Sequence, residues 1–212
     1  MKPELILFDL DGTMVNTSRD LTDSLNFALS QLGFPQLTCD QVISLVGHGV
    51  KETVFKGLPA DNRQMLEDAY PLFLEHYSEH CADKTFLYPD IEKVLEHFRD
   101  KKLAVTTNKR SLLSEKILCR HGILDRFEAV LGPDRVENKK PHPDHLRAAL
   151  KITESSAAKT VLIGDSLADV EAAQAAGIAV CAVTYGYTAR DVLAQGRPDY
   201  LIDCASELID LF

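Results

Sequence analysis

The stretch Leu5-Ile6-Leu7-Phe8-Asp9-Leu10-Asp11-Gly12-Thr13 decides the fold class of this sequence. Its first four residues form an apolar run without polar alternation, which is typical of a strand buried on both faces of a parallel sheet. Two carboxylates and a glycine follow where such a strand would leave the sheet. The stretch therefore predicts a central strand with chemically active residues at its carboxyl end.

Beyond residue 86, strand and helix patterns alternate to the end of the chain. We expect strands at 103–107, 129–131, 160–163, 178–183 and 200–202, and helices at 91–101, 111–121, 145–151, 167–176 and 206–211. This alternation indicates an α/β fold, a Rossmann-like doubly wound parallel sheet with helices on both faces.

The segment between the first strand and this alternation reads as helices. Apolar residues recur at helical spacing between Thr17, a candidate amino-terminal cap, and Gly33, and further helices are expected over 39–46, 50–57 and 61–80. A run of helices placed after a first strand predicts an inserted all-helical cap subdomain. We assign residues 16–84 to this cap domain, and residues 1–15 and 85–212 to the core domain.

Composition narrows the classes of partner. The 212 residues are 45% apolar and 26% charged, with a formal net charge of −9. Because the sequence has no basic stripe and no apolar run near the roughly 18 residues of a spanning helix, we expect neither nucleic acid nor membrane as a partner. Five scattered cysteines without C-x-x-C spacing predict reduced thiols in a cytoplasmic protein. A monomer or a homodimer is expected. The negative charge repels anions, so a phosphate ester would need a metal ion and a lysine nearby.

Polar residues gather after three of the predicted strands. They are Asp9 and Asp11, Thr107 and Asn108, and Asp165 and Asp169. Ligands of open parallel sheets bind outside the carboxyl ends of the strands, so these three segments would meet there if their strands are neighbours.

The carboxylates predict a metal site. Strand alternation places the side chains of Asp9 and Asp11 on the same side, and Asp165 adds a third acidic group. Such an oxygen-rich pocket suits Mg²⁺, which binds one or two carboxylates together with a substrate phosphate. The alternative is that these residues are ordinary turn and cap residues, since Asp-Gly is a common turn pair.

Four motifs in order resemble those of the haloacid dehalogenase superfamily, and within it the phosphoglycolate phosphatase-like branch. They are Asp9-Leu10-Asp11-Gly12-Thr13; Thr107 followed by Asn108-Lys109; Lys140 within Lys139-Lys140-Pro141-His142-Pro143-Asp144; and Gly164-Asp165-Ser166 followed by Asp169. Each motif is weak alone, but the ordered set is specific and the resemblance covers nearly the whole chain.

The resemblance implies a role for each matching residue. Asp9 would be the nucleophile that forms an aspartyl-phosphate, and Asp11 the general acid and base. Mg²⁺ would be held by Asp9, the backbone carbonyl of Asp11 and Asp165, with Asp169 as a ligand or a support. Thr107 and Lys140 would complete the catalytic set around the phosphoryl group.

Further residues are expected to contact the substrate. They are Gly12, Thr13 and Asn108 in the core, and Gly47, His48 and Lys51 in the insert. Plainer interpretations stay open: Thr107 and Asn108 could cap a helix, Lys140 could be a solvated loop lysine, and Asp169 could be an acid favoured in a first helical turn.

The function that these residues predict is a magnesium-dependent phosphomonoesterase acting on a small phosphate ester, with 2-phosphoglycolate as the leading candidate. Sugar phosphates, pyrophosphate and nucleotides are alternative substrates. A dehalogenase would need neither the metal nor the second aspartate, so the acidic set disfavours it. A phosphate-ligand sensor or protein-binding module without turnover is the alternative from another class. Two positions depart from the family pattern, Asn16-Thr17 and Asp90.

Overall fold

The computed structural model describes residues 2–212, which fall into two compact units. The first, which we call the core unit, consists of the chain up to Asn16 together with Leu87–Phe212. The second, the helical unit, is Thr17–Phe86. No helix within residues 2–212 combines the length and the apolar character needed to cross a membrane.

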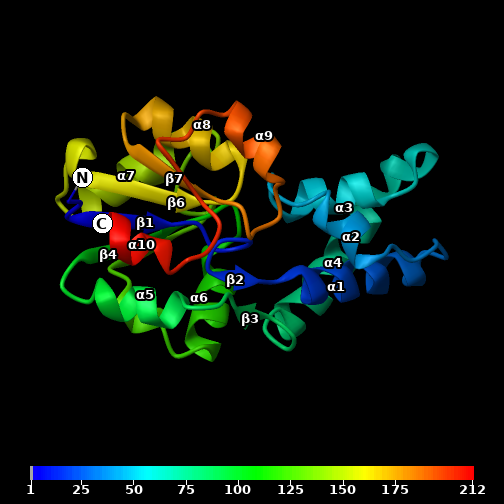
Figure 1. The fold of residues 1–212 in the computed structure, drawn as a ribbon. Coiled ribbons are helices and arrows are strands. Elements are labelled where there is room, and N and C mark those ends of the chain that lie inside the picture. Colours follow the sequence, from blue (N-terminus) through cyan, green and yellow to red (C-terminus); the bar gives the residue numbers. More distant parts are fainter. Residues whose placement is uncertain (1) are drawn as a thin grey trace. The chain divides into compact units, whose positions relative to one another are not determined.

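The core unit contains a six-stranded sheet in which every neighbouring pair is parallel (Figure 1). Its strands are β1 (Leu5–Phe8), β4 (Lys102–Thr106), β5 (Ala129–Leu131), β6 (Thr160–Gly164), β7 (Ala179–Val183) and β8 (Tyr200–Ile202). They lie in the order β5-β4-β1-β6-β7-β8, so the chain first builds outward from β1 in one direction and then returns to build in the other. This confirms the doubly wound α/β fold.

Helices cover both faces of this sheet (Figure 1). On one side lie α5 (Ile91–His97), α6 (Ser111–Arg120) and α10 (Glu207–Leu211), and on the other lie α7 (Asp144–Ile152) and α8 (Leu167–Ala176). Leu5 and Leu7 of β1 share a buried cluster with Leu146 of α7, while the ring of Phe8 meets Phe127 edge-on at 6.4 Å. Because β1 is packed on both faces, all four of its residues are apolar.

Short elements between these were harder to foresee. The helix α9 (Arg190–Gln195) was not predicted, and the 3₁₀ turns η2 (Leu124–Arg126) and η3 (Ala157–Lys159) precede β5 and β6. A second, two-stranded sheet of β2 (Val15–Asn16) and β3 (Phe86–Leu87) was not predicted either. Asp90, one of the departures from the family pattern, adopts a left-handed backbone with φ 65° directly before α5, a conformation in which glycine is usual.

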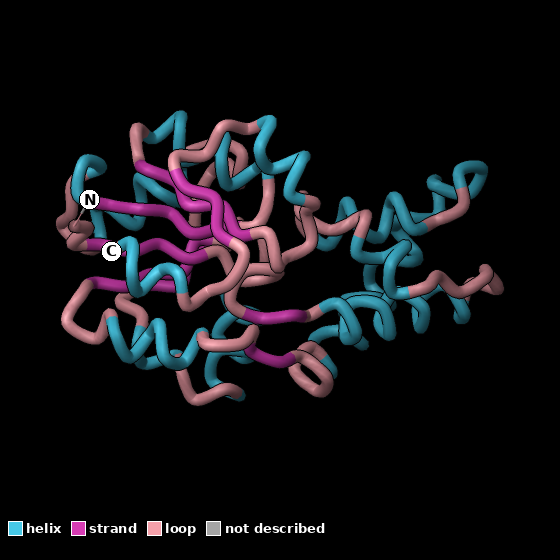
Figure 2. The backbone as a smooth tube through the Cα atoms, viewed as in Figure 1, coloured by secondary structure: helices cyan, strands magenta, loops and turns pink. Residues whose placement is uncertain are grey.

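The helical unit is a bundle of helices joined by loops, as Figure 2 shows. It comprises α1 (Ser18–Gln31), α2 (Cys39–Ile43), α3 (Val50–Gly57), η1 (Ala60–Met65) and α4 (Leu66–His80). Leu25 and Leu29 of α1 and Phe73 and Tyr77 of α4 are almost completely buried, and α1 packs on α4. The helix predicted over 61–80 is wrong at its start, because residues 60–65 form the tighter i→i+3 bonds of a 3₁₀ turn.

Asp20 ties the two ends of the helical unit together. Its buried carboxylate accepts hydrogen bonds from the backbone N–H groups of Lys84 and Thr85 and from the hydroxyl of Thr85, at 2.8 to 3.0 Å. The first and last residues of the helical unit therefore lie close together in space.

Candidate active site

Three strand ends bring the predicted polar segments together. Strand β1 lies between β4 and β6, and Asp9, Thr107 and Asp165 each follow one of these strands directly. All three residues are buried, with at most 8% of their surface exposed. Parallel strands end at the same edge, so the segments converge there as the sequence predicted.

Lys140 is the cation at the centre of this edge. Its Nζ lies 2.9 Å from Oδ1 of Asp9 and 2.5 Å from Oδ1 of Asp169, and it donates a 2.7 Å hydrogen bond to the carbonyl of Thr106. Because Lys140 is only 2% exposed, the interpretation of it as a solvated loop lysine is wrong. The lysine binds two carboxylates that would otherwise repel each other at close range.

Burial shapes the titration of this pair. It raises the pKa of Asp9 from 3.8 to about 6, with Lys140 opposing the shift and Asp169 adding to it. Burial alone would lower the pKa of Lys140, but Asp169 and Asp9 outweigh it and raise that pKa above its usual range. The lysine therefore stays charged at neutral pH, while ionisation of the Asp9 carboxyl group is less favourable than it would be in water.

Asp165 is held by the loops on either side of it. Its Oδ1 lies 3.3 Å from the hydroxyl of Thr13, and its Oδ2 accepts a 2.8 Å hydrogen bond from the backbone N–H of Tyr187. Burial raises the pKa of Asp165 well above its ordinary value, and the charges of Asp9 and Asp169 raise it further. The carboxylate thus sits in a site with an excess of negative charge.

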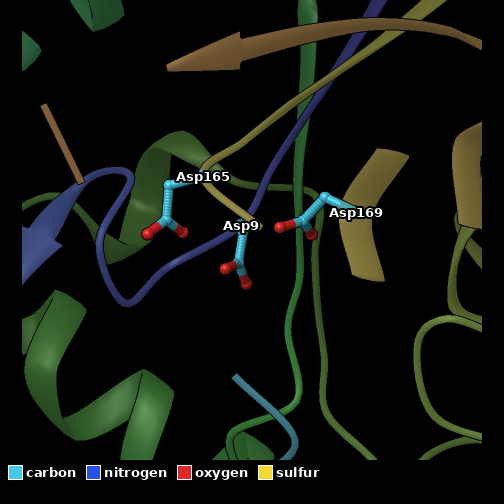
Figure 3. Close-up of side chains that lie close together, drawn as sticks. All are labelled: Asp9, Asp165 and Asp169. Carbon is cyan, nitrogen blue, oxygen red and sulfur yellow. The ribbon is translucent and has the colours of Figure 1, made fainter. Parts of the chain in front are cut away.

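Asp9, Asp165 and Asp169 form a cluster of buried carboxylates (Figure 3). One oxygen from each lies within 4.8 Å of the others. Hard oxygen donors held together in a site short of positive charge fit Mg²⁺. Of the three carboxylates, Asp169 is the one bound most by other protein groups. Lys140 binds its Oδ1, and its Oδ2 accepts hydrogen bonds from the N–H and hydroxyl of Ser166 at the start of α8.

Two glycines allow the loops to close around Asp165. Gly12 has φ 81°, and a Cβ there would lie 2.1 Å from Oδ2 of Asp165. A Cβ on Gly186 would lie 2.4 Å from both Cβ of Asp165 and the carbonyl oxygen of Gly12. The residue before Gly186 adds a direct contact, since the hydroxyl of Tyr185 donates to the carbonyl of Thr13 at 3.0 Å. Thr13, predicted as a substrate contact, thus also binds Asp165, and Gly12, predicted as another, lies against it.

Asp11 forms an ion pair with a second lysine, Lys109. Nζ of Lys109 lies 2.8 Å from Oδ1 and 2.7 Å from Oδ2 of Asp11. The side chains of Asp9 and Asp11 are still near enough for the Asp11 charge to contribute, as a minor cause, to the raised pKa of Asp9. The Asp11 carboxylate lies outside the cluster of Asp9, Asp165 and Asp169. The backbone carbonyl of Asp11, and not its side chain, is therefore the group expected to bind a metal.

Thr107 and Asn108 join the second motif to its neighbours. The N–H of Thr107 donates to the carbonyl of Leu131 at 3.0 Å, and its hydroxyl accepts from the N–H of Lys109 at 3.2 Å. The amide of Asn108 donates to the carbonyl of Lys140 at 3.0 Å. Neither residue caps α6, whose cap position is Arg110, so the helix-cap interpretation is wrong.

The predicted substrate contacts of the insert lie in the helical unit. Gly47 and His48 precede α3, and Lys51 is in its first turn, with Nζ 3.2 Å from Oε1 of Glu67 and 5.6 Å from the ring centre of Tyr70. Their contact with a substrate stays a prediction.

Four residues that shape the site were given no role from the sequence. They are Lys109, Tyr185, Gly186 and Tyr187. A signal existed for each: Lys109 directly follows Thr107-Asn108, and the other three follow a strand that ends at the same edge of the sheet as β1.

Comparison with known proteins agrees with this geometry. The haloacid dehalogenase-like hydrolase family matches residues 6–183. A phosphoglycolate phosphatase of Colwellia psychrerythraea is 34% identical over 97% of this chain and 95% of that protein, and one of Cupriavidus necator is 35% identical over 96% and 90%. The crystal structure of a predicted phosphoglycolate phosphatase from Haemophilus somnus has a TM-score of 0.90 at 30% identity, covering 100% of this chain and 98% of that one. Because the match spans most of the sequence and includes the strands that carry the buried carboxylates, the chain belongs to the haloacid dehalogenase-like hydrolases.

Proposed function

We propose that this protein is a phosphomonoesterase in which Asp9 takes the phosphoryl group of a small phosphate ester. The observation that carries the proposal is the buried pair of Asp9 and Lys140 beside Asp165 and Asp169. A carboxylate in this setting can act as a nucleophile, and the lysine beside it can offer positive charge to an incoming phosphoryl oxygen. The family and the names of its relatives make the chain a phosphoric monoester hydrolase.

The reaction would proceed by two displacements at phosphorus. First, an oxygen of Asp9 forms a bond to phosphorus while the bond to the leaving oxygen breaks and Asp11 gives that oxygen a proton. Second, water attacks phosphorus, its proton passes to Asp11, and the bond to Asp9 breaks. Thr107 and Lys140 would hold the phosphoryl oxygens during both steps.

Mg²⁺ fits the acidic side of this site. Asp9, Asp165 and the backbone carbonyl of Asp11 would hold it, while Asp169 would act by fixing Lys140. When bound, the ion offsets the negative charge of the phosphoryl group and so lets a carboxylate approach it.

The substrate proposed is 2-phosphoglycolate, because relatives named phosphoglycolate phosphatase align with this chain over nearly their whole length. We assign residues 16–84 the role of a cap over the core domain, with Gly47, His48 and Lys51 contacting the leaving group. Such a cap can exclude water and select among esters that the core alone would treat alike.

The proposal is tested by phosphate release from a panel of 2-phosphoglycolate, sugar phosphates, pyrophosphate and nucleotides, with Mg²⁺ or with excess chelator. We expect metal-dependent release with the highest kcat/KM for 2-phosphoglycolate. A different best ester would replace the substrate but keep the reaction. If the folded, metal-supplied protein released phosphate from none of them, the proposal would be wrong.

Replacing Asp165 with asparagine is expected to remove the response to Mg²⁺. The metal supplies several kcal/mol of transition-state stabilisation, so activity should fall on the order of 10²- to 10³-fold. Thermal unfolding with and without Mg²⁺ provides an independent readout, because an ion that binds only the folded state raises its stability. The matched control is Asp125→Asn on the exposed turn η2, which should keep both responses. An unchanged Mg²⁺ shift in Asp165→Asn would count against the metal site.

Replacing Gly186 with alanine is expected to weaken Mg²⁺ binding through Asp165. The added Cβ would meet Cβ of Asp165 and the carbonyl of Gly12, each at 2.4 Å, so the carboxylate must shift. The Mg²⁺ concentration for half-maximal activity should rise about 10-fold or more. Gly122→Ala is the control, since its Cβ meets nothing within 4 Å and costs only backbone strain at φ 68°, on the order of 1 kcal/mol. Equal Mg²⁺ requirements in the two variants would contradict the assignment.

A further inference from the structure

Lys109 is the second buried lysine of the site, and its ion pair is unlike those on the surface. Its side chain is 1% exposed, and the Asp11 side chain it binds is 15% exposed. Both carboxylate oxygens of Asp11 lie within 2.8 Å of the same Nζ, so the contact fixes the orientation of the carboxylate as well as its position. Moving two charges out of water usually costs more free energy than the attraction between them returns. A gain in folding stability therefore does not explain why this ion pair is buried.

The backbone of Lys109 is fixed by the same part of the site. Its N–H donates to the hydroxyl of Thr107 at 3.2 Å. Its carbonyl oxygen lies against Gly132, where a Cβ would come within 2.4 Å of it. The residue therefore connects the second motif to the first: one end holds Thr107 and the other holds Asp11.

We propose that Lys109 is a positioning residue for Asp11 in the proposed phosphatase reaction. By binding both oxygens, it sets the direction from which Asp11 meets the leaving oxygen and later the attacking water. This inference rests on the proposed function, because it assigns Lys109 a part in the two proton transfers of Asp11 and none in the bond to phosphorus. Lys140 has the complementary part, since it binds Asp9 and Asp169.

Leaving-group dependence separates this role from a merely structural one. Departure of an alkyl oxygen requires a proton from Asp11, whereas p-nitrophenolate leaves readily without one. The parameter kcat/KM reports the first displacement for both esters. Lys109→Met should therefore lower kcat/KM for an alkyl phosphate on the order of 10²-fold, and for p-nitrophenyl phosphate only about 3-fold or less.

The experiment compares wild type, Lys109→Met, Asp11→Asn, the double variant and Asp9→Asn on both esters with Mg²⁺. Lys109→Arg keeps the charge but changes the donor geometry. It should also lose more kcat/KM on the alkyl phosphate than on p-nitrophenyl phosphate, with a smaller difference between the two esters. It serves as the test if the methionine variant does not fold. Lys151→Met on the exposed end of α7 is the control and should match wild type. In the double variant the loss should be no greater than in Asp11→Asn alone, because the lysine acts through the aspartate.

Equal losses on the two esters, no loss in either Lys109 variant, or additive losses in the double variant would overturn the role of Lys109. These outcomes are distinct from a failure of the proposed function. That failure would appear as a wild type that hydrolyses neither ester, or as activity that survives Asp9→Asn.

Discussion

Replacing Asp9 with asparagine is expected to lower phosphate release at least about 10⁴-fold, because the variant lacks the oxygen that attacks phosphorus. The amide keeps the size of the side chain, so the loss isolates the chemistry. Steady-state phosphate release with Mg²⁺ measures it, and Asp125→Asn on the exposed turn η2 is the control. Activity within about 10-fold of wild type would remove Asp9 from the nucleophile position.

The same substitution is expected to stabilise the metal-free protein at neutral pH. Burial raises the pKa of Asp9 from 3.8 to about 6, so the folded protein binds this proton more tightly than the unfolded chain does. The free energy of unfolding contributed by Asp9 therefore falls as the pH rises from about 4 to about 6, and the penalty is complete above that range. Two pKa units correspond to roughly 3 kcal/mol, of which the variant should recover about 1–3 kcal/mol.

Chemical unfolding in chelator at pH 4 and pH 7.5 tests this second effect. The gain of Asp9→Asn over wild type should appear at the higher pH and shrink at the lower one. A variant that is less stable than wild type at pH 7.5 would mean that Lys140 stabilises the ionised carboxylate more than burial destabilises it.

Replacing Lys140 with methionine is expected to have the largest effect on stability. The side chain of similar length fills the space, but Asp9 and Asp169 lose the ammonium that lies 2.9 and 2.5 Å from their oxygens. Removing one partner of a buried ionic group costs about 3–5 kcal/mol, because the remaining charges stay buried without compensation. Activity should also fall on the order of 10³-fold with the loss of positive charge at the phosphoryl group.

Lys139→Met is the matched control for this change, since the neighbouring lysine is exposed. Its stability in urea should lie within about 0.5 kcal/mol of wild type. The deficit of Lys140→Met should narrow as the pH falls, because protonation of Asp9 removes one of the uncompensated charges. A deficit that does not change between pH 7.5 and pH 4 would point to lost packing instead of charge.

The sheet was predictable because its inner strands are packed on both faces. A strand such as β1 can contain only apolar residues there, so it stands out as a short continuous run. The helix α9 gave no comparable signal: it has six residues, and Leu193 is the one that is buried. The start of α4 was misplaced because the pattern that predicts a helix does not distinguish an α-helical turn from the 3₁₀ turn of η1.

The presence of the four aspartates and Lys140 at the site was predictable, but the way in which the residues of the site pair was not. Asp9, Lys140 and Asp165 stand in recognisable motifs, and the order of the strands brings Asp9 and Asp165 together. The pairing of Lys109 with Asp11 joins residues 98 positions apart and depends on the paths of two loops. The need for glycine at 186 arises from the approach of one loop to Asp165, and no local pattern in the sequence encodes that distance.

The most direct test of the account is the stereochemical course of the reaction at phosphorus. The best ester of the panel is prepared with a transferred phosphorus made chiral by oxygen isotopes and one sulfur, and the configuration of the released thiophosphate is determined. Attack by Asp9 followed by attack of water makes two in-line displacements, so the account predicts net retention. Net inversion would show a single displacement by water and would contradict the assignment of Asp9 as the nucleophile.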